Sequence, residues 1–94
     1  MRAGILVEHE PGEQRLRSLG AADWPVWSCE ESEFPWEYHA SETCLLPDGD
    51  AEVFPGGSAD AVRLAGGDLV TFRKGPRCVW RVLSPVRKHY GFED

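Results

Sequence analysis

The chain has 94 residues, a formal net charge of −6 and a hydrophobic fraction of 41% that includes four Trp, four Phe and two Tyr. This length predicts one domain, residues 1–94, because so short a chain cannot enclose a second core. The acidic balance argues against nucleic acid as a partner, since a nucleic-acid site needs a basic face. No apolar run reaches the ~18 residues that a membrane helix needs, so we also expect no membrane partner.

The chain contains three cysteines, Cys29, Cys44 and Cys78, without any C-x-x-C spacing. An odd number at such spacing argues against a disulfide framework or a zinc site and favours reduced thiols. Residues 1–7 are too few for a signal peptide, and charged residues follow them at once. These features predict a cytoplasmic protein.

The first predicted elements are a short β-strand at residues 5–7 and a helix at residues 11–19. Pro11 suits the first helical turn, Glu13 suits the positive helix N-terminus, and Gly20 suits the C-cap. The helix offers only Leu16 and Leu19 as apolar contacts, so we expect it on the surface. We assign the N-terminal strand and helix to residues 1–22 and a β-barrel to residues 23–94.

After the helix the apolar period changes to two, and turn signals recur. The stretch from Phe34 to Leu46 alternates, with apolar residues and Glu42 on one parity. Turns are predicted at residues 47–50, 55–58, 65–68 and 73–76, between strands at 51–54, 61–64, 69–72 and 78–83. Pro85 is expected to begin a tail that holds a last strand at residues 87–92. Turns every roughly 8–12 residues between short strands predict an all-β sandwich or barrel.

Six residues separate Glu42 from Gly49, and Gly67 is followed at fixed spacing by Gly75 and Cys78. These spacings resemble the two motifs of the cupin superfamily, G-x5-H-x-H-x3-E-x6-G and G-x5-P-x-G-x2-H-x3-N. Glu42, Gly49, Gly67 and Gly75 match these motifs. The other motif positions hold Glu30, Trp36, Tyr38, Arg73, Cys78 and Val82.

The resemblance extends over residues 5–92 through phrases in a fixed order. These are WPVW (24–27), SEFPW (32–36), ETC (42–44), GDLVTF (67–72), RCVW (77–80) and PVRK (85–88). They are similar to small single-domain cupins of unknown function, related to ethanolamine-utilisation protein Q and (S)-ureidoglycine aminohydrolase. The resemblance implies an all-β fold, a cupin-type jelly-roll β-barrel with one short N-terminal helix.

In metal-binding cupins, two histidines and the glutamate of the first motif and the histidine of the second motif bind one divalent metal. At these positions the chain has Trp36, which has no ligand atom, and Tyr38, which would ligate only as a phenolate from a reference pKa of about 10. His39 falls on the opposite face by strand alternation. We therefore expect no metal cofactor, while a divalent metal held by Glu42 and Cys78 stays open.

The barrel interior is the candidate site. Six residues share the inward parity of their strands: Trp36, Tyr38, Glu42, Cys44, Cys78 and Trp80. They predict either an aromatic-walled cavity or a barrel filled by its own side chains. A buried carboxylate needs a hydrogen-bond donor, and the candidates for Glu42 are Tyr38, Thr71, Arg77 and Lys88.

Three functions remain open from the sequence. The first is binding of a small polar-aromatic or amine-bearing ligand, with Glu42 as its anchor. The second is an aminohydrolase- or isomerase-like enzyme with Glu42 as general acid/base and Cys78 or Tyr38 assisting. The third is a structural or regulatory dimer with a filled barrel.

The ligand-binding candidates in the first case are Trp36, Tyr38, Cys44, Thr71, Trp80 and Lys88. A homodimer is expected in each case, because so small a barrel gains stability by pairing. Trp24 and Trp27 are expected to clamp the N-terminal segment or to lie in the dimer interface.

Overall fold

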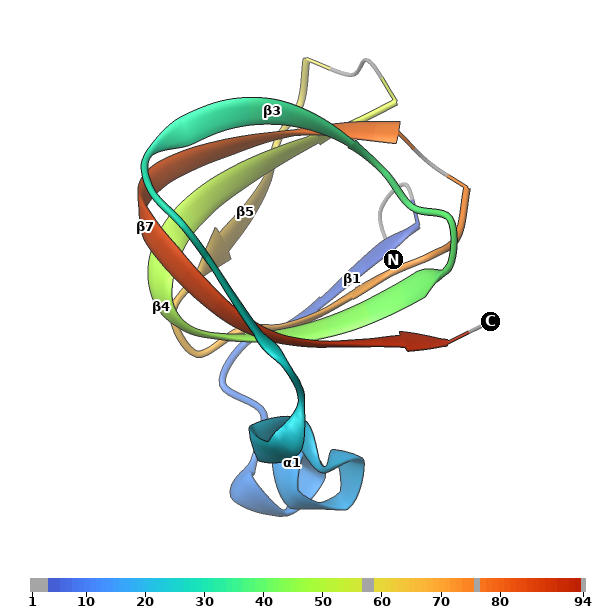
Figure 1. The fold of residues 1–94 in the computed structure, drawn as a ribbon, viewed down its shortest axis with the longest axis vertical. Helices are drawn as coiled ribbons and strands as arrows, with labels where there is room; N and C mark the ends of the chain where they lie inside the picture. The colour runs from blue at the N-terminus through green and yellow to red at the C-terminus, as the bar shows by residue number, and fades with distance from the viewer. Residues whose placement is uncertain (1–3, 57–58, 76, 94) are drawn as a thin grey trace.

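The computed structural model describes residues 4–56, 59–75 and 77–93, and these residues form one curled antiparallel sheet with a short helix outside it (Figure 1). The strand order is β1-β6-β4-β7-β2, with β3 added to β7 and β5 added to β4. The elements are β1 (Ile5–Glu8), α1 (Glu13–Leu19), the 3-10 helix η1 (Ala21–Asp23), β2 (Val26–Cys29), β3 (Ser32–Glu37), β4 (Ser41–Pro55), β5 (Val62–Ala65), β6 (Leu69–Phe72) and β7 (Arg77–Glu93).

Two long strands, β4 and β7, form the spine of the barrel. They pair antiparallel from Ser41 opposite Glu93 to Pro55 opposite Cys78. Each strand changes its second partner midway. Residues 42–45 of β4 pair with β6 and residues 50–53 with β5, while residues 77–82 of β7 pair with β3 and residues 86–89 with β2. These changes of partner let a single sheet enclose an interior.

The turn predicted at residues 47–50 is wrong, because β4 runs through it without reversing. The register against β7 shifts three times, between Leu45 and Asp48, between Asp48 and Asp50, and between Asp50 and Ala51. Bulges of this kind bend a strand and need the same permissive residue types as turns. The buried parity changes across the bulges, from residues 42, 44 and 46 to residues 51, 53 and 55. The sequence therefore located the bend but not its type.

The strand predicted at residues 87–92 is confirmed, but the tail predicted to begin at Pro85 is wrong. Pro85 lies inside β7, where the strand passes from its pairing with β3 to its pairing with β2. The residues beyond it, including Lys88, consequently belong to the barrel wall.

Several smaller predictions are confirmed. The helix is present with no buried residue, and Gly20 ends it in the left-handed conformation at φ 68°. The turn at residues 65–68 is closed by the buried Asp68 carboxylate, which accepts the Ala65 N–H at 2.9 Å. The turns at 55–58 and 73–76, and the N-terminal residues 1–7, fall partly outside the described residues.

No helix in the described part of the chain is long and apolar enough to cross a membrane.

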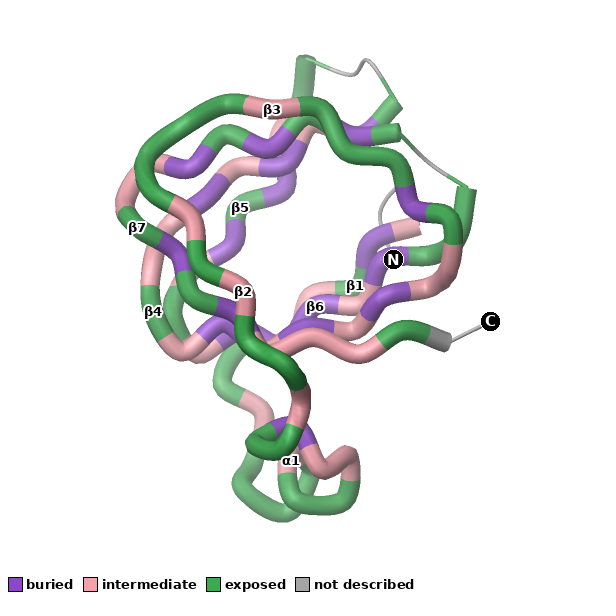
Figure 2. Tube along the Cα trace, viewed as in Figure 1, coloured by how far each residue is buried: buried purple, intermediate pink, exposed green. Residues whose placement is uncertain are grey.

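The interior is packed solid at one side by aromatic rings. Tyr38 stacks on Phe72 with 4.6 Å between ring centroids, and Trp80 lies 5.7 Å from Phe72. The Trp80 indole N–H donates to the Tyr38 hydroxyl at 3.1 Å. Buried positions alternate with less buried ones along β4, whereas α1 is largely exposed (Figure 2). The solid part of the core forms one wall of the cavity described below.

Gly49 is expected to be indispensable to the β4 bend. Its φ is 110°, and a Cβ there would lie 2.7 Å from the Pro85 carbonyl oxygen and the Val86 Cα. Gly49→Ala should lower the free energy of unfolding by about 2 kcal/mol or more, through backbone strain and overlap. Gly20→Ala is the matched control, because Gly20 also has positive φ but nothing within 4 Å of its Cβ position. Gly20→Ala should lower the free energy of unfolding by about 1 kcal/mol, from the left-handed backbone alone. Equal losses in urea denaturation would contradict the steric argument.

Candidate functional site

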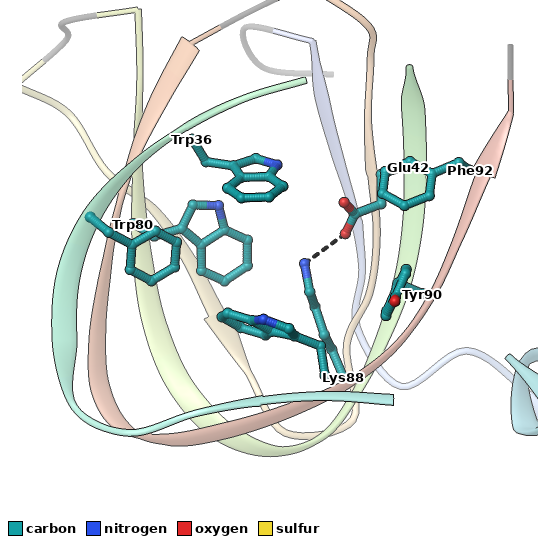
Figure 3. A pocket seen from close by; sticks show the side chains of 8 residues that line it. Trp36, Glu42, Trp80, Lys88, Tyr90 and Phe92 are labelled. Carbon is teal, nitrogen blue, oxygen red and sulfur yellow. Dashed lines mark hydrogen bonds and ion pairs between the residues drawn. The ribbon is translucent and has the colours of Figure 1, made fainter. Parts of the chain in front are cut away.

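A cavity of about 260 Å³ opens into the barrel between β3 and the C-terminal half of β7. Its walls are mainly aromatic, and its charged groups are Glu42 and Lys88 (Figure 3). The lining residues are Trp27, Phe34, Trp36, Glu42, Trp80, Lys88, Tyr90 and Phe92. The barrel is therefore open on this side of the packed rings.

A buried ion pair connects the two spine strands inside the cavity. The Lys88 Nζ donates to Glu42 Oε2 at 2.7 Å, and the Glu42 and Lys88 side chains are 1% and 11% exposed. Glu42 lies opposite Phe92 in the β4–β7 register, and Lys88 is on the same face of β7 as Tyr90 and Phe92 by alternation. The lysine stem runs along that face to reach the carboxylate (Figure 3). Of the four donors considered from the sequence, Lys88 is the partner of Glu42.

Aromatic rings surround the Lys88 ammonium. Its Nζ lies 5.0 Å from the ring centroid of Trp27, 5.1 Å from that of Trp80 and 6.0 Å from that of Tyr90. Each ring face attracts a cation by roughly 0.5–2 kcal/mol, depending on desolvation. An ammonium has three N–H donors, and among the described residues only Glu42 accepts from it. Donors thus remain for a molecule that enters the cavity.

The structure divides the predicted site residues into two groups. Glu42, Trp36, Trp80 and Lys88 line the cavity together. Tyr38, Cys44, Cys78 and Thr71 are not among its lining residues. Any part they have in ligand binding stays a prediction.

The second group lies behind or beside the cavity. Tyr38 is buried behind Trp80, and Cys44 is fully buried on β4. Cys78 is buried where β7 lies opposite Trp36 and Pro55. Thr71 lies on β6, opposite Leu6 and Thr43.

Four cavity residues were missed from the sequence: Trp27, Phe34, Tyr90 and Phe92. Trp27 was expected to clamp the N-terminal segment or to lie in a dimer interface. Its ring lies 5.0 Å from the Lys88 Nζ and lines the cavity, and the interface stays a prediction. Phe34 shares the parity of Trp36, so strand alternation alone would have placed it on the inward face beside Trp36. Tyr90 and Phe92 share the parity of Lys88 within the strand predicted at residues 87–92, but that strand was assigned to a tail and not to the barrel wall.

The two buried thiols are poor nucleophiles. Burial raises the pKa of Cys44 to about 12, with smaller effects from Lys88 and Glu42. Burial also raises the pKa of Cys78. A thiol of this kind packs as a small apolar group, because the thiolate is the reactive form.

Native-state alkylation should distinguish the three cysteines. We expect iodoacetamide at pH 8 to modify Cys29, which is partly exposed, and to leave Cys44 and Cys78 unmodified until the protein unfolds. Peptide mapping of the alkylated protein measures this directly. Modification of Cys78 at the rate of Cys29 in the folded protein would restore it as a candidate nucleophile.

The family follows from comparison with known proteins. A family model described as "EutQ-like cupin domain" matches residues 16–90. The chain is an EutQ-like cupin. The all-β jelly-roll fold expected from the sequence is thereby confirmed. No curated protein matches this cupin.

Solved structures agree with this assignment. A DUF861 family protein from Thermotoga maritima is 43% identical, with a TM-score of 0.90, and the alignment covers 95% of this cupin and 99% of that chain. The EutQ protein of Clostridium difficile is 23% identical with a TM-score of 0.62, covering 69% of this cupin and 50% of that chain. A protein of unknown function (DUF1255) from Acidithiobacillus ferrooxidans is 17% identical with a TM-score of 0.64, and the alignment covers 68% of this cupin and 60% of that chain. The last two show the fold alone.

The residues present do not fit the divalent metal that the cupin resemblance implies. The described residues contain no group of three or more His, Cys, Asp or Glu side chains that could hold an ion. Glu42 already neutralises an ammonium at 2.7 Å, and Cys78 lies outside the cavity lining. A metal at Glu42 would have to displace Lys88 and leave that cation buried without its carboxylate.

The Glu42–Lys88 pair should behave as a single energetic unit. Lys88→Met leaves a buried carboxylate and Glu42→Leu leaves a buried ammonium, so each should lower the free energy of unfolding by about 3–5 kcal/mol. The double variant Glu42→Leu/Lys88→Met removes both charges and should recover most of that loss or exceed the wild type. Urea denaturation of all four proteins gives the coupling energy. Additive losses would show that the two side chains do not depend on each other.

Proposed function

We propose that this cupin binds a small organic molecule with a flat apolar body and a hydrogen-bond acceptor directed at Lys88. The observation that supports it is the placement of one ammonium, held by Glu42, inside a cavity whose other lining residues are aromatic. Sites for small molecules typically combine apolar walls with a few placed polar groups. The acceptor of the ligand, a carbonyl or carboxylate oxygen, would take a charge-assisted hydrogen bond from Nζ.

The charge arrangement favours an acceptor over a cation. The sequence suggested a polar-aromatic or amine-bearing ligand anchored by Glu42. That carboxylate is already bonded to Lys88, and the Lys88 ammonium already occupies the ring faces of Trp27, Trp80 and Tyr90. An incoming amine would compete with the chain's own cation for the same partners. The role that fits Glu42 better is to hold Lys88.

The size and rim of the cavity favour a molecule of one ring. A cavity of about 150 Å³ lined by apolar side chains binds benzene, so the 260 Å³ here leaves room for one ring and its polar group. Two lining residues remain well exposed, Trp36 at 46% and Phe92 at 54%. A ligand bound against Trp36 and Phe92 would remove part of their apolar surface from water. Each Å² of apolar surface removed stabilises the complex by about 25 cal/mol.

The other two functions are supported less directly. A filled barrel is disfavoured by the cavity itself, although a homodimer stays compatible with ligand binding. Acid/base chemistry at Glu42 is supported by a proton donor at 2.7 Å.

Tryptophan fluorescence should report binding directly, because three of the four tryptophans line the cavity. We expect benzamide and benzoate to change the emission in a saturable way and benzylamine to bind at least about tenfold more weakly. Lys88→Met should weaken benzamide binding by roughly 10- to 100-fold, the equivalent of a lost hydrogen bond from a charged donor.

Lys74→Met is the matched control, since Lys74 is the other lysine and is exposed. It should bind benzamide as the wild type does. If Lys88→Met is unstable, Glu42→Leu/Lys88→Met serves instead, because it leaves no lone buried charge. Saturable binding of benzylamine in preference to the two acceptors would overturn the proposal.

A further inference from the structure

Lys88 is a primary amine directed into an organic-ligand cavity, with a proton acceptor in contact. We propose that Lys88 forms a reversible imine with an aldehyde or ketone, and that Glu42 carries the protons. This inference rests on the binding function proposed above and specifies its ligand class. The acceptor directed at Lys88 is then a carbonyl oxygen, and the carbonyl carbon beside it is the atom that reacts.

The neutral amine required for this reaction is available by one short proton transfer. The Nζ and Glu42 Oε2 are 2.7 Å apart, which is within the range for direct transfer between donor and acceptor. Both side chains are buried, so the transfer takes place away from bulk water. Lysine amines form Schiff bases with carbonyl compounds in many enzymes. A flat ligand lying between Trp36 and Phe92 would exclude more water from the pair.

The reaction balances without any further reagent. Lys88 gives one proton to Glu42, and its nitrogen lone pair forms a bond to the carbonyl carbon. The carbonyl π electrons move to the oxygen, which takes that proton and becomes a hydroxyl. Glu42 then takes a second proton from nitrogen and delivers it to the hydroxyl. The C–O bond breaks and releases water, while the nitrogen lone pair forms the C=N bond.

The pocket suits the product as well as it suits the free lysine. The iminium nitrogen keeps one proton and one positive charge, and Glu42 ends as a carboxylate, so the charge balance of the site is unchanged. The faces of Trp27, Trp80 and Tyr90 lie 5.0–6.0 Å from Nζ and would attract the iminium as they attract the ammonium. The same cation–π contacts therefore remain available when the ammonium becomes an iminium.

Benzaldehyde with sodium cyanoborohydride provides the test, because the hydride reduces an iminium to a stable benzyl amine. The chain has two lysines, so Lys74 is an internal control within the same molecule. Peptide mapping after short exposures should show benzylation of Lys88 at least about tenfold faster than of Lys74. Lys88→Arg keeps the positive charge and should abolish cavity labelling. Glu42→Gln should slow the labelling of Lys88 by roughly 100-fold or more, as expected for a lost acid/base group.

The same samples separate this inference from the binding proposal. Benzamide has no carbonyl that forms an imine, and it should protect Lys88 from benzylation while leaving Lys74 unaffected. Saturable benzamide binding with no benzylation of Lys88 would overturn the imine and leave the binding function standing. If benzamide does not bind and Lys88 is not benzylated, the binding function and the imine are both overturned. Equal labelling of Lys74 and Lys88 in the wild type would reduce the reaction to general amine chemistry and also overturn the imine proposal.

Discussion

The antiparallel pairing of β4 with β7 determines both the barrel and its cavity. Both strands bend near their middle, at residues 47–50 of β4 and near Pro85 of β7, and Gly49 lets the two backbones touch there. On one side of the bends the interior fills with rings. On the other side the same pairing places Glu42 opposite Phe92 and carries Lys88 back into the barrel. The ion pair therefore depends on a register that the bends fix.

A lysine of the chain supplies the positive charge that the cupin resemblance assigned to a metal. A buried carboxylate needs a compensating cation, and Lys88 meets that need from within the sequence. A tethered ammonium has a cost in side-chain freedom but no dependence on ion concentration. It also differs in chemistry, because an ammonium donates protons, whereas a metal accepts electron pairs. The reactivity expected of this barrel changes accordingly.

The sequence predicted which residues point inward better than how deep they lie. Period-two alternation identified Tyr38, Cys44 and Cys78 as inward-facing, and all three are buried. Parity does not show whether an inward residue borders a cavity or lies beneath its wall. Pro85 caused the largest error, because proline usually ends a strand unless a bulge or edge accommodates it. The strand predicted at residues 87–92 already puts Tyr90 and Phe92 on the face of Lys88, but only the pairing of β7 with β2, β3 and β4 shows that this face borders the cavity.

Stability alone is a weak reason for a charged pair in such a place. Replacing a buried ion pair with apolar side chains of similar volume is often neutral or stabilising. The cavity already has abundant aromatic surface with which such side chains could pack. Apolar residues, however, could not provide an N–H donor and a carboxylate in a cavity whose other lining residues are aromatic. If the double replacement raises stability while ligand binding is lost, the pair serves the ligand rather than the fold. If the double replacement loses stability as each single one does, the pair is a structural link between β4 and β7, and the cavity beside it is incidental.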